Sequence, residues 1–131
     1  MALLFVYRKG PHMAVNIGAK GLQEVNLTIP QNTSLTFTVV HKDDAGHVID
    51  HSGSTAHLAF KSKDGTTLYD LDSCCTCANS GIYVTIPAST SAALPLGKLN
   101  WDMIVAQSNG EQTRLCYGAV TIVDTYALDE D

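Results

Sequence analysis

The sequence predicts an all-β fold: an antiparallel β-sandwich of about seven to nine strands with one short helix near residues 89–94. Two observations lead to this prediction. Apolar and polar side chains alternate at period two along most of the chain, and turn-forming residues interrupt the alternation at short intervals. Half-buried strands in this number bury their apolar faces most readily when two sheets pack face to face.

The alternating segments supply the strands of this prediction. Leu35, Phe37 and Val39 share one face of an expected strand, and threonines occupy the other face. The longest apolar stripe runs through residues 99–105 and directs Trp101 into the core. The further alternating segments are residues 22–29, 55–61, 67–71, 82–86 and 115–123.

Turn and helix signals divide these strands. Asp64-Gly65 and Asn109-Gly110 each predict a tight hairpin, because both dipeptides tolerate the positive φ that a two-residue turn requires. The one segment with helical character, residues 88–94, begins with hydroxyl side chains suited to capping and ends before a Pro-Leu-Gly sequence.

The chain has 131 residues, a length that suits one domain. We expect residues 21–123 to form the sandwich and residues 1–20 to form an N-terminal arm. Residues 124–131 are expected to form an acidic C-terminal tail, because they hold four carboxylates and no basic residue.

The apolar start of the chain is the candidate partner-binding segment. Its residues are Leu3, Leu4, Phe5, Val6 and Tyr7. An extended apolar arm can add a strand to the sheet of a neighbouring subunit through main-chain hydrogen bonds. The basic residues follow this run, which is the reverse of a secretory signal. An alternative is that residues 1–12 are a cloning remnant or come from a start codon upstream of the natural one. In that case Met13 would be the native start.

The charge pattern argues against two classes of partner. The formal net charge is -5, and the eight lysines and arginines are scattered singly, so no basic patch for nucleic acid is expected. No apolar run approaches the roughly 18 residues that a membrane helix requires. We therefore expect neither nucleic acid nor membrane as a partner.

The cysteines are expected to be free thiols. Cys74, Cys75 and Cys77 fall in an expected polar loop, residues 72–80, and Cys116 falls in the last strand as a small core residue. Their spacing differs from the paired C-x2-4-C of common zinc sites. Without an export signal, reduced thiols are the default, while a disulfide between Cys116 and a loop cysteine and a metal site stay open as alternatives.

The other polar clusters favour structural roles. His41, His47, His51 and His57 lie among turns and strands, where we expect them to be solvent-exposed rather than to converge on a metal. The aspartates at 43, 44, 50, 70 and 72 are expected to stabilise turns, since a calcium loop would need a following glutamate. A nucleophile, base and stabiliser cannot be assembled, so we expect no enzyme, no catalytic residue, no metal and no cofactor.

Several stretches, taken in order, carry a family resemblance. They are LTFTVV (35–40), DAGHVID (44–50), STAHLAFK (54–61), GIYVTIPASTSAALPLG (81–97), LNWDM (99–103) and GEQTRLCYGAVTI (110–122). This order resembles the immunoglobulin-like sandwich domains of tailed-bacteriophage structural proteins, among them the amino-terminal domain of baseplate upper proteins and small head-decoration and tail modules. The resemblance covers roughly residues 33 to 123 and implies an immunoglobulin-like β-sandwich.

The resemblance implies a structural protein of the virion, assembled in the cytoplasm of a host bacterium. Our first expectation is a capsid decoration or cement protein, and the alternative is a tail baseplate or fibre-attachment module. A second alternative is a host-surface or carbohydrate-binding module, for which Trp101 or Tyr83 would have to be exposed. The expected partners are the major capsid protein or tail proteins, together with further copies of the chain in a homo-oligomer.

Overall fold

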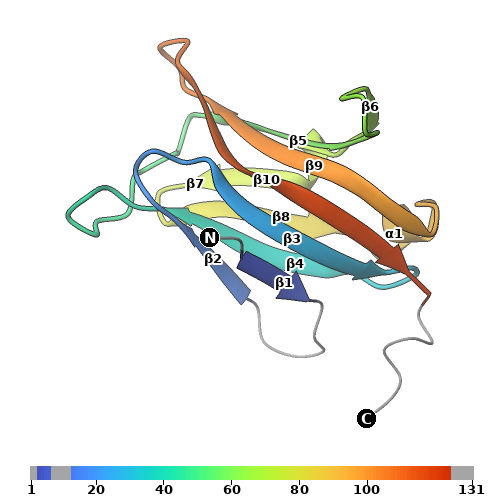
Figure 1. Cartoon of the computed structure of the whole chain (residues 1–131). Helices are drawn as coiled ribbons and strands as arrows, with labels where there is room; N and C mark the ends of the chain where they lie inside the picture. The colour runs from blue at the N-terminus through green and yellow to red at the C-terminus, as the bar shows by residue number, and fades with distance from the viewer. Residues whose placement is uncertain (1–2, 7–12, 125–131) are drawn as a thin grey trace.

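The computed structural model describes residues 3–6 and 13–124, with side chains from residue 14 onward. Two layers of sheet make up this part of the chain (Figure 1). The elements in chain order are β1 Leu3–Val6, β2 Met13–Ile17, β3 Gln23–Pro30, β4 Leu35–His41, β5 Thr55–Lys61, β6 Thr67–Asp70, the 3-10 turn η1 Asp72–Cys74, β7 Cys75–Ala78, β8 Gly81–Ile86, α1 Ala88–Ala92, β9 Gly97–Ala106 and β10 Gln112–Val123.

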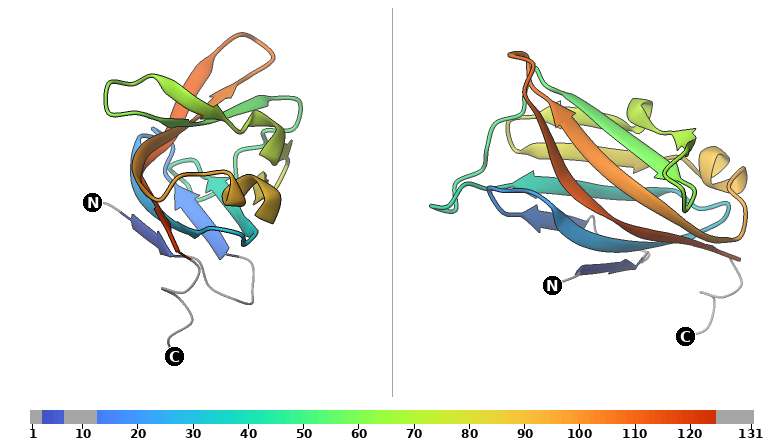
Figure 2. Two further views of the ribbon diagram at one scale, coloured as in Figure 1. Left: turned by 90° about the vertical axis from the view of Figure 1, so that its right-hand side faces the viewer. Right: turned by 45° about the horizontal axis from the view of Figure 1, so that its top comes forward.

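The two sheets confirm the predicted β-sandwich. One sheet has six strands in the order β1-β3-β10-β9-β5-β6, and the other has four in the order β2-β4-β8-β7. The two expected hairpins are present, because β5 pairs with β6 and β9 pairs with β10, both antiparallel. Helix α1 lies at one end of the sandwich, as expected (Figure 2).

Three strand pairs are parallel, which corrects the expectation of a purely antiparallel sandwich. They are β1 with β3, β3 with β10, and β2 with β4. The reason lies in the connections between the sheets. The chain passes from β2 in the smaller sheet to β3 in the larger one and returns to β4, so β2 and β4 run in the same direction.

Two segments that we expected to lie outside the sheets contain strands. Residues 13–17 of the expected N-terminal arm form β2, in register with β4, and Val15 and Ile17 are buried. In the segment expected as a polar loop, residues 75–78 form β7 at the edge of the smaller sheet. The sequence of this strand, CTCA, contains only small side chains, so it shows no clear alternation of apolar and polar residues.

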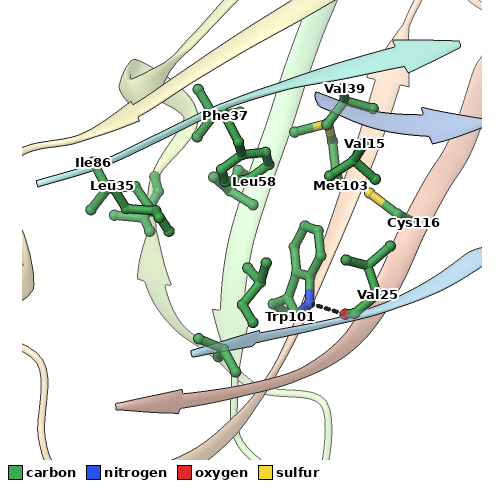
Figure 3. Packing of buried hydrophobic residues seen from close by; sticks show 14 of the residues in the cluster. Val15, Val25, Leu35, Phe37, Val39, Leu58, Ile86, Trp101, Met103 and Cys116 are labelled. Atoms are coloured by element: carbon green, nitrogen blue, oxygen red, sulfur yellow. Dashed lines mark hydrogen bonds between the residues drawn. The ribbon is translucent and has the colours of Figure 1, made fainter. Parts of the chain in front are cut away.

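The core lies between the inner faces of the two sheets (Figure 3). Trp101 is one of its largest fully buried side chains, as the alternation predicted, and its Nε1–H donates to the carbonyl oxygen of Val25 at 2.8 Å. Gly118 faces the same carbonyl, and a Cβ at this position would overlap the Val25 oxygen. The glycine is therefore required by the close approach of β3 to β10.

Candidate functional site

The predicted partner-binding segment forms strand β1 at the edge of the six-stranded sheet. Leu3 to Val6 pair in parallel register with Val25 to Thr28 of β3. Tyr7, the last residue of the predicted segment, lies outside the described residues. One side of the β1 backbone thus pairs within its own chain, and binding of a partner by this segment stays a prediction.

A second candidate surface lies on the outer face of the six-stranded sheet. Here a groove of about 670 Å³ crosses β3, β10 and β9 and is bordered by the β5–β6 turn. We call this feature the outer groove. Its charged lining residues are Lys61, Lys63, Lys98, Arg114, Glu24 and Asp102.

The outer groove corrects the expectation that the basic residues are scattered over the surface. Four of the eight lysines and arginines of the chain line it, against two acids. The groove is therefore positive in a chain whose formal net charge is -5. The bases are separated in the sequence, and the pairing of β10 with β9 and of β9 with β5 brings them together.

Asp102 forms the floor of the outer groove. Its side chain is only 8% exposed, and its Oδ2 accepts a hydrogen bond from Lys61 Nζ at 2.9 Å. Nη2 of Arg114 lies 3.5 Å from the same oxygen. The Arg114 guanidinium also lies over the ring of Tyr117, 5.0 Å from its centroid. One buried carboxylate thus holds two cations in place.

The other two cations of the groove have no carboxylate partner among the residues that the structure describes. Lys63 stands in the β5–β6 turn, and Lys98 lies on β9 opposite Thr121 of β10. Both lysines are exposed, and neither forms a salt bridge with any residue that the structure describes. The groove can therefore attract further negative charge.

Two histidines contradict the expectation of solvent exposure. His41 and His51 are 5% and 1% exposed, and their rings stack with an interplanar angle of 6°. Nδ1 of His41 lies 2.9 Å from Nε2 of His51, and Nε2 of His41 lies 3.0 Å from the carbonyl oxygen of Ala19. His41 continues the inward positions of Leu35 to Val39, so period two could have predicted its burial.

The hydrogen bonds of this histidine pair define its tautomers when both rings are neutral. A carbonyl oxygen only accepts, so Nε2 of His41 carries the proton and its Nδ1 is an acceptor. His51 therefore donates from Nε2, which leaves its buried Nδ1 as an unprotonated nitrogen with no hydrogen-bond partner in the described part of the chain. Burial and the neighbouring His41 both lower the pKa of His51, while the carboxylate of Asp50 raises it to a smaller extent.

The two remaining histidines of this group are exposed, as expected. Nδ1 of His57 lies 2.8 Å from Oδ2 of Asp72. His47 lies 3.8 Å from Asp43 within one turn. None of the four residues in these contacts lines the outer groove.

The four cysteines form no disulfide with one another. Cys116 is fully buried on β10, and burial, followed by the charge of Asp102, raises its pKa to about 12. The other three are partly buried against the core, and burial raises the pKa of Cys75 to about 12. Burial also raises the pKa values of Cys74 and Cys77.

Three of the expected turn-stabilising aspartates, Asp43, Asp50 and Asp70, accept hydrogen bonds from backbone N–H groups two to four residues further on, whereas Asp72 accepts from the N–H of Leu58 on β5. Asp43 accepts from Ala45 and His47, and Asp50 accepts from Ser52. Asp64 does the same in the β5–β6 turn with Thr66, and its hydrogen bonds lower its pKa to about 2. The carboxylate oxygens of Asp43, Asp50 and Asp64 therefore stabilise the turns in which these residues lie.

The described residues contain no group of three or more His, Cys, Asp or Glu side chains placed to hold a metal ion. No helix in residues 3–6 and 13–124 has the length and apolar character needed to cross a bilayer.

The fold resembles a solved phage domain. The structure superposes on the "N-terminal domain of phage TP901-1 ORF48" with a TM-score of 0.51, over 86% of this chain and 98% of that chain, at 10% sequence identity. No family model and no curated protein sequence matches the chain. At this identity the similarity defines the class of fold, a β-sandwich of the kind found in that domain.

Proposed function

We propose that this protein is a structural component of a tailed-phage virion and that its place is the tail baseplate. The observation that carries the proposal is the agreement of two similarities. The order of sequence segments resembles amino-terminal domains of baseplate upper proteins, and the fold matches the amino-terminal domain of a phage protein over nearly its whole length. This agreement favours the tail alternative over capsid decoration, our first expectation from sequence.

In this role the protein acts by contact rather than by catalysis, and we propose no enzymatic activity and no cofactor. The partners proposed are other tail proteins and further copies of the chain. β1 at the sheet edge is a suitable place for such contacts, because an edge strand presents unpaired backbone groups on its outer side. A virion component of this kind is expected to form a closed homo-oligomer.

The location can be tested on phage particles. Purified particles that carry this protein are labelled with an antibody to it, detected by gold and imaged by electron microscopy, with pre-immune serum as the control. We expect gold at the distal end of the tail. Gold distributed over the capsid would restore the decoration role, and particles that lack the protein altogether would reject both.

The contact through the N-terminal arm has its own test. A variant without residues 1–12 keeps β2, which begins at Met13, but loses β1. We expect this variant to fold and to assemble into particles less efficiently than the full chain when both compete in the same infection. Equal incorporation would show that the arm makes no partner contact.

A further inference from the structure

The outer groove is lined by four basic side chains and only two acidic ones, Glu24 and Asp102, so its cations outnumber its carboxylates. Lys61 and Arg114 share the single carboxylate of Asp102, and Lys63 and Lys98 have no salt bridge among the residues that the structure describes. The protein as a whole is acidic, with a formal net charge of -5. A positive groove on an acidic molecule attracts a negatively charged partner and orients it toward this face.

We propose that the outer groove binds an acidic polypeptide segment, whose aspartate or glutamate side chains pair with Lys63, Lys98 and Arg114. The buried carboxylate of Asp102 supports this role, because it fixes Lys61 and Arg114 before a ligand arrives. Ordering these long side chains in advance lowers the entropic cost of binding. A guanidinium held in this way can bind a second carboxylate with two parallel hydrogen bonds.

The aromatic residues of the groove argue against a saccharide or a single-stranded nucleic acid as the occupant. Both of these ligands gain affinity by stacking on an open aromatic face. Trp101 is only 2% exposed. Its ring points into the core, and its Nε1–H donates a hydrogen bond to the carbonyl oxygen of Val25 (Figure 3). The ring of Tyr117 is covered by Arg114. Recognition in this groove therefore depends on charge.

The remaining lining residues suit an extended peptide. Asn100, Thr28 and Thr121 lie on neighbouring strands and offer amide and hydroxyl groups to a main chain. The outer groove crosses three strands and is bordered by the β5–β6 turn, so its lysines stand at different places along it. Successive acidic side chains of an extended peptide can therefore each reach a different lysine. Residues 124–131 hold four carboxylates and no basic residue, so the acidic segment that fits the outer groove is this C-terminal segment of another copy of the chain.

The test measures binding of a fluorescein-labelled hexaglutamate peptide to the full chain by fluorescence anisotropy at low salt, with hexaglutamine as the uncharged control peptide. We expect saturable binding of hexaglutamate alone, weakened by added salt. The double variant K63Q/K98Q should weaken it about tenfold, since exposed ion pairs each contribute modestly. The matched variant K20Q/K42Q removes the same charge outside the groove and should leave the affinity within about twofold.

The outcomes separate the possible occupants. Lack of hexaglutamate binding at millimolar concentration, or an equal loss in both double variants, would overturn the proposal. So would a heparin fragment that binds the groove more tightly than the peptide does and is equally sensitive to K63Q/K98Q. Groove-dependent binding of a peptide with the sequence of residues 124–131 would support the proposal and identify another copy as the source. Hexaglutamate binding without binding of that peptide would overturn the assignment of the occupant to another copy of the chain.

This proposal does not depend on the place of the protein in the particle. Capsid labelling in the microscopy experiment would reject the baseplate role and leave the groove chemistry intact. If the outer groove does not bind acidic peptides, the proposed baseplate role is unaffected. The two experiments can therefore fail separately.

Discussion

The two faces of the six-stranded sheet are made by alternate residues of the same strands, yet they are built on different principles. On the inner face, Trp101 is buried by apolar side chains from both sheets. On the outer face, the next residue, Asp102, is buried beneath Lys61 and Arg114. The inner face gains its stability from apolar area removed from water, whereas the outer face contains a buried carboxylate whose charge two cations compensate. Substitutions on the two faces should therefore have different consequences.

The largest effect is expected from Trp101→Ala on the inner face. Removing a buried indole leaves a cavity and also takes the hydrogen-bond donor from the Val25 carbonyl. We expect the free energy of unfolding to fall by about 3–5 kcal/mol. Urea unfolding followed by circular dichroism measures it, because the variant has no tryptophan fluorescence.

Trp101→Phe is the matched control for this substitution. It keeps most of the apolar area and loses the Nε1–H that binds Val25, so its cost should be clearly smaller than that of the alanine variant. A loss below about 1 kcal/mol for Trp101→Ala would mean that the indole is not the core residue described here.

The contrast between the faces also marks what could be predicted from sequence. The inner face was predictable, because period two directs every second residue of a strand to the same side and Trp101 belongs to the longest apolar stripe. The hairpins were predictable for a similar local reason, since Asp64-Gly65 and Asn109-Gly110 carry their turn geometry in two residues.

The outer groove was not predictable in the same way. Lys61, Lys98 and Arg114 look isolated along the chain and become neighbours only through the registers that pair β9 with β5 and β10. The register between strands that are far apart in the sequence depends on the whole sheet, so it cannot be predicted from the sequence of a single strand. The parallel pairs were missed for the same reason, because they depend on which sheet each strand joins.

The second-largest effect is expected from Asp102→Asn on the outer face. The change removes the charge that compensates Lys61 and Arg114 while it keeps the shape of the side chain. Because both cations remain partly exposed to water, the loss should be about 1–3 kcal/mol, less than for Trp101→Ala. Urea unfolding measures it, and Asp44→Asn on an exposed turn is the control, with a change within about 0.5 kcal/mol. Equal values for the two variants would show that the outer network adds no stability.

A third, smaller effect concerns the buried pair of His41 and His51. Burial lowers the pKa of His51 below its usual 6.5, so the folded state binds fewer protons than the unfolded state once the pH falls below about 6.5. The stability contributed by neutral His51 is fully present above that pH and declines as the solution is acidified toward the folded-state pKa.

The measurement is the free energy of unfolding between pH 8 and pH 5 for the wild type and for His51→Gln. We expect the wild type to lose more stability on acidification than the variant, which cannot take up this proton. His47→Gln, on an exposed turn, should follow the wild-type curve. Parallel curves for wild type and His51→Gln would exclude the pair as the source of the pH dependence.

The last prediction uses the chemical labelling of Cys116 to compare substitutions on the two faces of the sheet. Cys116 is fully buried, and burial raises its pKa to about 12, so iodoacetamide at pH 8 should modify it only when the sandwich opens. Cys74 and Cys77 are partly exposed and should react in the folded protein. Peptide mass spectrometry over time gives each rate. Because labelling of Cys116 follows the population of the open state, Trp101→Ala should accelerate it more than Asp102→Asn does. Modification of Cys116 as fast as Cys74 in the wild type would contradict its place between the sheets.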